Sequence, residues 1–185
     1  MIETERLILR DWCETDWQPF FESTNTPGVM RWLGGMMDAS AMAAQRERLL
    51  DYNARYGHTM WALGRKADGG HLSGELLGFC GLKRANQKGA PIGDFEIGWR
   101  LREDAWGRGY AREAAEASLA AGFERYNAPH IIALTVEGNE PSWGLMRRLG
   151  MHRRQDLDFD SDEWDSDDGK IIAHSITQDE WRAGQ

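Results

Sequence analysis

Trp106-Gly107-Arg108-Gly109-Tyr110-Ala111 is a glycine-rich stretch between two segments with different hydrophobic patterns. Residues 95–101 before it are mostly apolar and β-favouring and show no helical period, which predicts a strand. From Ala111 to residue 126, small and apolar side chains recur every fourth position, as they do on one face of a helix. The sequence therefore predicts a strand, a tight loop and a helix that begins directly after the loop.

A glycine loop at the start of a helix predicts a binding site for an anion. The first N–H groups of a helix have no partner within the helix and lie at the positive end of its dipole. Gly107 and Gly109 let the backbone approach a phosphate closely, while Arg108 and Arg112 add positive charge at the same end. The alternative, on these residues alone, is that the two glycines only turn the chain.

Two familiar phosphate loops do not fit this stretch. A nucleotide P-loop ends in Gly-Lys-Ser/Thr, which is absent here, and the Rossmann pattern Gly-x-Gly-x-x-Gly has Arg112 in place of its third glycine. The stretch instead resembles the pyrophosphate loop of the GNAT superfamily of N-acetyltransferases, with the pattern Gln/Arg-x-x-Gly-x-Gly/Ala. Gly109 and Ala111 match its last two fixed positions, and Trp106 stands in place of Gln or Arg.

The Rim-type branch of this superfamily, which is similar to the ribosomal-protein N-terminal acetyltransferases, commonly shows the same departure at the Trp106 position. The resemblance to that branch is collinear over almost the whole chain. It is carried by Thr4-Glu5-Arg6-Leu7-Ile8-Leu9-Arg10, Glu96-Ile97-Gly98-Trp99-Arg100-Leu101, Asn139-Glu140-Pro141-Ser142 and Leu149-Gly150-Met151. It implies an acyltransferase that takes acetyl from acetyl-CoA and transfers it to an amine.

Hydrophobic patterns elsewhere predict an α/β fold (α+β by some schemes). Strands are expected at residues 6–11, 58–64, 76–82, 130–136, 151–154 and 171–176, and helices at residues 14–21, 27–33, 38–56 and 141–149. A right-handed crossover from strand 95–101 through helix 112–126 to strand 130–136 makes these two strands parallel neighbours. The resemblance implies a mixed, mostly antiparallel sheet with helices on both faces, and a splay between the two parallel strands that admits the cofactor.

The composition predicts one N-acetyltransferase domain over residues 1–185, since 41% of the residues are hydrophobic and 10% are aromatic. Residues 1–10 lack the apolar region of a signal peptide, and no apolar run approaches the length of about 20 residues that crosses a bilayer. Two cysteines, Cys13 and Cys80, do not make a disulfide framework. We therefore expect a cytoplasmic protein without a membrane partner. We expect it to be a monomer or a homodimer.

Residues 156–168 carry a negative charge equal to the whole net charge of −8, so the rest of the chain is neutral. This balance disfavours a nucleic-acid partner, because phosphate contacts need a basic face. The segment is predicted to be a solvated loop, or alternatively to attract a cationic amine.

Asp156, Asp158 and Asp160 have the spacing of a calcium loop, but Ser161 replaces its glycine. The five histidines show no ligand spacing either, so we predict no metal site.

The resemblance places acetyl-CoA along the strand 95–101 and the glycine loop. The backbone of Trp99 to Leu101 is expected to pair with the pantetheine amides, and the loop N–H groups to hold the pyrophosphate. A backbone N–H near Gly98 or Trp99 would polarise the thioester carbonyl. The predicted cofactor-binding residues are Trp99, Arg100, Leu101, Trp106, Gly107, Arg108, Gly109, Tyr110, Ala111, Arg112, Asn139 and Ser142.

Direct attack on the thioester needs a neutral amine, so a base has to remove the proton that an alkyl amine carries near neutral pH. Glu96 is the first candidate for this base, because burial in an apolar strand beside the cofactor would raise the pKa of its carboxyl. The alternative is a structural carboxylate paired with an arginine such as Arg100. Glu137, at the end of the strand 130–136, is the second candidate for the base.

The leaving thiolate needs a proton or a hydrogen bond, which many GNAT members provide with a tyrosine. Met146 stands at that position here, and its side chain has no acid chemistry. Ser142 is the remaining candidate for this role, or else its first-turn hydroxyl satisfies a backbone group. Asn139 is expected to bind the cofactor through its amide, or else to cap the following helix.

Trp32, Trp61 and Trp164 fall where the acceptor is expected to lie, although tryptophans more often belong to the core or its rim. The acceptor is predicted to be a protein N-terminal α-amine or a small amine such as a polyamine or aminoglycoside. No covalent enzyme intermediate is expected, since neither cysteine lies near the cofactor motifs. The absent tyrosine leaves one different class open, a GNAT-like domain that binds CoA but acts as a sensor or scaffold.

Overall fold

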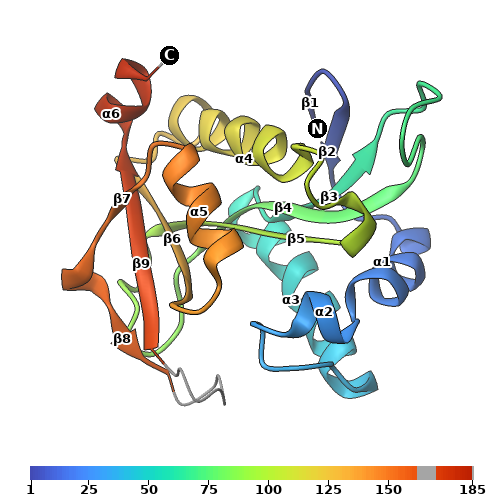
Figure 1. Ribbon diagram of the computed structural model, residues 1–185, viewed down its shortest axis with the longest axis horizontal. Helices are drawn as coiled ribbons and strands as arrows, with labels where there is room; N and C mark the ends of the chain where they lie inside the picture. The colour runs from blue at the N-terminus through green and yellow to red at the C-terminus, as the bar shows by residue number, and fades with distance from the viewer. Residues whose placement is uncertain (162–169, 185) are drawn as a thin grey trace.

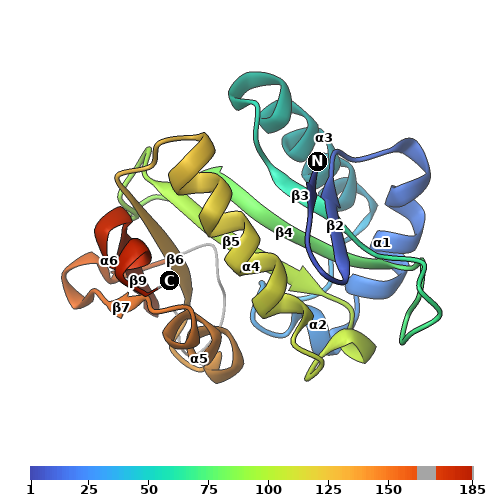
Figure 2. The same ribbon diagram turned by 90° about the horizontal axis from the view of Figure 1, so that it is seen from above.

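The computed structural model describes residues 1–161 and 170–184. These residues form one mixed sheet with helices on both faces (Figures 1 and 2). The strand order along the sheet is β1-β2-β3-β4-β5-β6-β9-β7, and β8 pairs with β9 off this path. The pairing is antiparallel throughout the described part of the sheet except between β5 and β6, which are parallel. The predicted fold class is therefore confirmed.

The elements agree closely with the segments expected from the sequence. The strands are β1 (Ile2–Glu3), β2 (Leu7–Arg10), β3 (Met60–Arg65), β4 (Leu76–Arg84), β5 (Phe95–Leu101), β6 (His130–Val136), β7 (His152–Arg153), β8 (Phe159–Asp160) and β9 (Lys170–Thr177). The helices are α1 (Trp17–Thr24), α2 (Pro27–Met30), α3 (Ala39–Tyr56), α4 (Tyr110–Ala120), α5 (Glu140–Arg148) and α6 (Gln178–Ala183). Short 3-10 turns occupy Glu14–Asp16, Glu103–Ala105 and Gln155–Leu157, and α4 continues as a π-helical turn over Ala121–Arg125.

Three elements were not expected from the sequence. β1 and β8 contain two residues each, which is too short for a strand period to show. α6 begins at a capping box in which the Thr177 side chain accepts from the Glu180 N–H, and the Glu180 carboxylate accepts from the Thr177 N–H. This Thr-x-x-Glu signal is present in the sequence and predicts a helix start.

The main core lies between the sheet and the face that α4 and α5 cover. Small side chains let α4 approach the sheet, because the Ser118 hydroxyl on α4 lies only 3.6 Å from the Cys80 sulfur on β4. Cys80 is fully buried, as expected for a strand-core residue, and burial raises the pKa of its thiol to about 12. α1 and α3 cover the opposite face, where Trp17, Leu49 and Met60 form a second cluster.

The parallel strands β5 and β6 separate soon after they meet. Their register pairs only Phe95 with Ile131 and Glu96 with Ile132. β4 accompanies β5 along its whole length to Leu101, and β9 accompanies β6 to Val136. Beyond Glu96, the edge of β5 that faces β6 is therefore free of strand pairing, which is the splay that the resemblance implied.

Two glycines in helical segments have opposite surroundings, and this predicts opposite effects of an added methyl group. A Cβ at Gly122 would lie 2.5 Å from the Ile131 Cδ1 atom, whereas the nearest atom to one at Gly144 is the end of the flexible Arg148 side chain at 3.4 Å. We expect Gly122→Ala to lower the free energy of unfolding by about 1–3 kcal/mol through overpacking. Gly144→Ala should raise it by about 0.5–1 kcal/mol. Urea denaturation measures the free energy of unfolding of both variants. A Gly122→Ala variant as stable as the wild type would contradict the packing described.

Candidate active site

The free edge of β5 presents backbone groups to the gap beside β6. The Arg102 N–H donates to the Leu77 carbonyl on β4 at 2.9 Å. Peptide groups alternate between the two edges of a strand, so those of Trp99 and Leu101 face away from β4. The Trp106 indole N–H confirms this direction, because it donates to the Leu101 carbonyl from that side at 2.9 Å. The N–H and carbonyl of Trp99 are thus directed into the gap.

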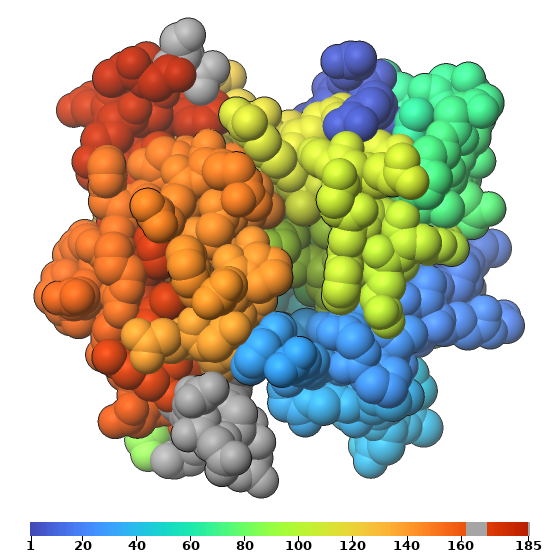
Figure 3. Space-filling view, viewed as in Figure 1, coloured from blue at the N-terminus to red at the C-terminus, as the bar shows by residue number. Residues whose placement is uncertain are grey.

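The glycine loop lies at the C-terminal end of this edge. Gly107 and Gly109 have φ values of +70° and +80°, in the left-handed region that favours glycine. Gly109 is the N-cap of α4 and provides no side-chain hydrogen bond to the helix. The first N–H groups of α4, beginning at Tyr110, are therefore without capping side chains. Figure 3 shows the surface hollowed between α5 and the segment that leads into α4.

The two arginines of the loop region, Arg108 and Arg112, differ in whether they form an ion pair. Arg108 is exposed. Arg112 is exposed as well, but its Nε donates to the Glu116 carboxylate one turn along α4 at 2.8 Å. The Trp106 ring is 51% exposed beside the loop, although its N–H is bonded. Within the described residues, the loop thus combines N–H groups that lack capping side chains with the Arg108 guanidinium, which forms no ion pair there.

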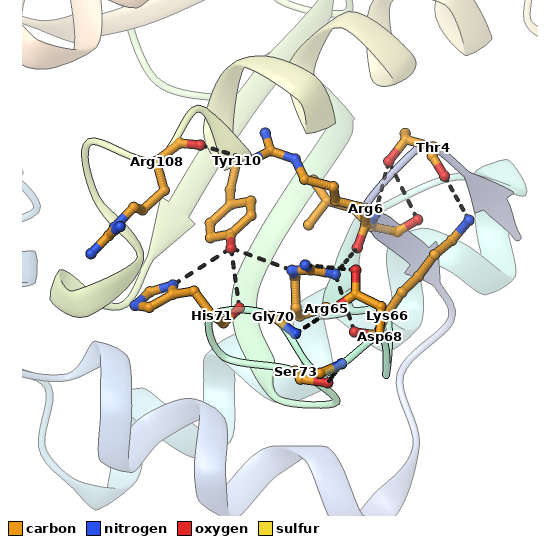
Figure 4. Close-up of polar contacts among 12 residues, drawn as sticks. Thr4, Arg6, Arg65, Lys66, Asp68, Gly70, His71, Ser73, Arg108 and Tyr110 are labelled. Carbon is orange, nitrogen blue, oxygen red and sulfur yellow. Dashed lines mark hydrogen bonds and ion pairs between the residues drawn. The ribbon is translucent and has the colours of Figure 1, made fainter.

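Two of the predicted cofactor-binding residues turn their side chains away from the gap. Tyr110 is 3% exposed, and its hydroxyl oxygen accepts from Arg65 Nε at 3.3 Å and donates to the His71 carbonyl at 3.1 Å (Figure 4). Arg100 lies on the opposite face of the sheet, where its guanidinium donates to Gln45 Oε1 at 3.2 Å and packs against the Phe20 ring. Both residues have only backbone groups to offer at the gap.

Glu96 is buried in β5 on the face that carries Arg100. Its Oε2 atom lies 3.0 Å from Lys83 Nζ on β4 as an ion pair, and this oxygen accepts no hydrogen bond from the described residues. Burial raises the pKa of the Glu96 carboxyl, and the charge and proximity of Lys83 oppose that effect. The structural partner that the sequence suggested, Arg100, does not contact Glu96; Lys83 does. The second candidate base, Glu137, is exposed after β6.

The start of α5 holds the other predicted residues. Asn139 is the N-cap but does not cap the helix with its side chain; its amide donates to the Thr135 hydroxyl at 3.0 Å instead. The Ser142 side chain is half-buried, and its hydroxyl forms no hydrogen bond within the described residues. The alternative interpretations of both residues, a helix cap and a satisfied first-turn hydroxyl, are therefore not realised. Met146 is 1% exposed and belongs to the main core.

Of the three tryptophans expected near the acceptor, the two in the described residues, Trp32 and Trp61, have different surroundings. Trp32 is half-buried, and the Arg31 guanidinium lies 4.6 Å from the centre of its ring. Trp61 is 4% exposed and packs in the main core, since its position in β3 directs it to the face under α4. Trp164 lies outside the described residues. Of Trp32 and Trp61, Trp32 is the one with a surface that a ligand can reach.

The described part of the acidic segment is engaged in ion pairs. Asp156 contacts Arg154 at 2.7 Å, and Asp158 contacts Arg153 at 2.5 Å. Hydrogen bonds from these arginines lower the pKa of both carboxyls. Within residues 1–161 and 170–184, no group of three or more His, Cys, Asp or Glu side chains is arranged to hold a metal ion. None of the helices in these ranges combines the length and apolar character that crossing a membrane requires.

Sequence comparison places this geometry in a known family. A family model described as "Acetyltransferase (GNAT) domain" matches residues 6–152, which include β5, the glycine loop, α4, β6 and α5. The protein YkkB of Bacillus subtilis (strain 168) is 31% identical over 154 residues, which are 80% of this chain and 83% of the relative. The uncharacterized N-acetyltransferase YnaD of the same organism is 27% identical over 186 residues, which are 97% of this chain and 98% of the relative.

Solved structures share the fold. The acetyltransferase from Agrobacterium tumefaciens str. C58 has a TM-score of 0.77 at 24% identity, covering 95% of this chain and 92% of its own. A ribosomal-protein-S5-alanine acetyltransferase from Vibrio fischeri has a TM-score of 0.74 at 17% identity, with 97% of each chain covered. A spermidine N-acetyltransferase from Vibrio cholerae, in complex with CoA and spermine, has a TM-score of 0.74 at 14% identity, covering 97% of this chain and 99% of its own.

The family model spans most of the chain, and YnaD, which matches nearly its full length, is named as an N-acetyltransferase. The match also extends across the elements that form the gap and the glycine loop. We conclude that the chain belongs to the GNAT family of acetyltransferases.

Proposed function

We propose that this acetyltransferase binds acetyl-CoA in the gap between β5 and β6 and transfers the acetyl group directly to a primary amine in a ternary complex. One observation carries the proposal: β5 and β6 pair only as far as Glu96 and Ile132, and the free edge leads to an uncapped helix start. A free strand edge accepts amides as an added strand would. A helix start with glycines at positive φ accepts a diphosphate.

The residues at the gap fit this ligand. The Trp99 N–H and carbonyl face the position of the pantetheine amides, whereas the Leu101 carbonyl is already bonded to Trp106. The N–H groups from Gly107 to Arg112 face the diphosphate in the proposal. The Trp99 N–H, or that of Gly98, would polarise the thioester carbonyl and stabilise the oxyanion that forms during attack.

Glu96 is proposed as the base that takes the proton from the amine, directly or through water. Its carboxyl is buried, which raises its pKa towards the range in which a base can exchange protons near neutral pH. The Lys83 ammonium, 3.0 Å from Glu96 Oε2, stabilises the ionised form of the Glu96 carboxyl. The amine can then attack the thioester carbonyl without an intermediate bound to the enzyme.

Ser142 is proposed to donate a hydrogen bond to the leaving thiolate. Its hydroxyl has no partner among the described residues, so it is available for this role. Asn139 engages only its NH₂ group, with Thr135, among residues 1–161 and 170–184, so its amide oxygen is available for a cofactor amide. Met146, buried in the core, takes no part.

The acceptor is proposed to be a protein N-terminal α-amine, as the Rim-type resemblance indicates, with a small amine such as a polyamine as the competing choice. The fold neighbours named for ribosomal-protein-S5-alanine and for spermidine illustrate both. An α-amine titrates near pH ~8 and an alkyl amine nearer ~10. A rate that levels off near pH 8 therefore supports the first choice, and one that rises towards pH 10 supports the second.

Thiol release from acetyl-CoA tests the proposal with a panel of N-terminal peptides, polyamines and aminoglycosides. Turnover with any amine supports direct transfer. Saturable acetyl-CoA binding without turnover across the panel would instead favour the sensor or scaffold that the missing tyrosine left open. A burst of thiol before amine is added would contradict a ternary complex.

Ser142→Ala is expected to lower kcat by about 10²-fold, because a weak acid is lost at the leaving group. Ser142→Thr retains the hydroxyl and should keep most of the rate. Steady-state kinetics at saturating acetyl-CoA measure both variants. Equal rates in Ser142→Ala and the wild type would show that the thiolate needs no help from this residue.

A further inference from the structure

Arg6, which immediately precedes β2, touches both the glycine loop and the first turn of α4. Its NH1 group donates to the Arg108 carbonyl at 3.0 Å (Figure 4). Its Nε donates to Glu113 Oε2 at 2.7 Å. Its guanidinium also lies over the Tyr110 ring, 4.7 Å from the centroid. One side chain from the start of the chain therefore bridges three positions around the helix start.

Glu113 holds Arg6 in this place. Its Oε1 atom accepts from the Thr4 hydroxyl at 2.5 Å and from the Arg6 backbone N–H at 2.8 Å. Burial alone would raise the pKa of the Glu113 carboxyl, but these hydrogen bonds and the charge of Arg6 leave it below its ordinary value. The carboxylate is thus ionised at neutral pH and fixes both the backbone and the guanidinium of Arg6.

The contact with the Arg108 carbonyl determines which way the next N–H points. The described chain has no cis peptide bond, and in a trans peptide the carbonyl and the N–H point in opposite directions. The Arg108 carbonyl faces Arg6, so the Gly109 N–H faces away from Arg6. The guanidinium is close behind the loop, since a Cβ built at Gly109 would lie 3.3 Å from Arg6 NH2.

We propose that Arg6 is a positioning residue for diphosphate binding: it fixes the Arg108–Gly109 peptide with its N–H directed at the diphosphate of the donor, and Glu113 and Thr4 hold Arg6 in place. The inference rests on the proposed function of the loop. It adds that the loop conformation depends on the Arg6 side chain, about a hundred residues away in sequence, as well as on the glycines.

The physical reason is the freedom of Gly109. A glycine with φ near +80° can adopt other conformations at little cost. Without Arg6, the peptide can turn its carbonyl dipole towards the diphosphate, which replaces an attraction by a repulsion. A hydrogen bond to a charged group is lost as well, so the donor is bound roughly ten- to a hundredfold more weakly.

The test compares two donors, acetyl-CoA and S-acetylpantetheine, which has the same thioester and amides but no diphosphate. Arg6→Ala should lower kcat/KM for acetyl-CoA roughly ten- to a hundredfold and leave kcat/KM for S-acetylpantetheine unchanged. Arg6→Lys keeps the charge but cannot bridge Arg108 and Glu113, so it should lose most of the preference for acetyl-CoA over S-acetylpantetheine. Glu113→Gln keeps the size of the side chain and should lose part of that preference.

Arg10→Ala is the matched control. Arg10 pairs with Asp16 at 2.6 Å, and its side chain is 33% exposed against 34% for Arg6, but it does not contact the loop. We expect this variant to keep the wild-type preference for acetyl-CoA. Urea denaturation of all variants measures the stability that each ion pair contributes.

Equal losses with both donors in Arg6→Ala would overturn the proposal, because they would show a merely structural role. No loss with either donor would overturn it too. A wild-type enzyme that uses both donors equally well would overturn the diphosphate role of the loop itself. As a second readout, the Gly109 amide ¹⁵N resonance should shift on CoA addition in the wild type and not in Arg6→Lys.

Discussion

Gly109→Val is expected to abolish measurable acetyl-CoA binding, with affinity at least about a hundredfold weaker than in the wild type. Gly109 has φ +80°, which a β-branched residue adopts only with strain. Its Cβ would also lie 3.3 Å from Arg6 NH2, so either the guanidinium or the loop would have to shift. Because the N–H groups of this loop are proposed to hold the diphosphate, a displaced loop loses several hydrogen bonds at once. Isothermal titration calorimetry measures the affinity.

Gly57→Val separates this effect from a loss of stability. Gly57 ends α3 with φ +68°, and a Cβ there meets no atom within 4 Å. The same substitution at Gly57 should therefore cost a similar backbone strain of about 1–3 kcal/mol while acetyl-CoA affinity stays at the wild-type level. Wild-type affinity in Gly109→Val would contradict the account, since the glycines would then only turn the chain.

Glu96→Gln is expected to lower kcat/KM by about 10²–10³-fold near neutral pH, because the variant keeps the shape of the side chain but cannot accept a proton. The wild-type rate should rise with pH as Glu96 ionises. Since burial raises the pKa of this carboxyl, the rise should lie above the range of an ordinary glutamate. A pH–rate profile with an amine of known pKa measures both effects.

Lys83→Met tests whether Glu96 is the group that titrates, through the direction in which the pH–rate profile moves. The Lys83 ammonium, 3.0 Å from Glu96 Oε2, favours the ionised carboxylate and lowers its pKa. Removing the ammonium should raise that pKa further, so the ascending limb of the profile moves to higher pH. If Glu96→Gln instead retained the wild-type rate and profile, the base would have to be another group, and Glu137 would be tested next.

The local patterns were enough to predict the framework of the site. The helix α4 begins directly after the glycine loop, as predicted, because the signals for the loop and the helix lie within a few residues of one another. Gly107 and Gly109 take positive φ within that loop. The parallel pairing of β5 and β6 followed from the handedness of a strand–helix–strand crossover. The splay did not follow from periodicity; it came from the family resemblance.

Contacts between distant residues could not be predicted in this way. The partner of Glu96 is Lys83 and not Arg100, because the antiparallel register of β4 and β5 places Lys83 directly opposite Glu96. The bridge from Arg6 to Glu113 joins residues 107 positions apart. The core position of Trp61 depends on which face of β3 lies under α4, and a single strand does not reveal this.

Backbone amide resonances of ¹⁵N-labelled protein, followed during titration with acetyl-CoA, test the central claim most directly. The account predicts saturable shifts at Trp99 and at residues 107–112, on the free edge of β5 and the start of α4. The groove lined by Trp17, Phe21 and Met42 between α1 and α3 should give no shifts. Absence of binding, or shifts confined to that groove, would contradict the placement of the donor between β5 and β6.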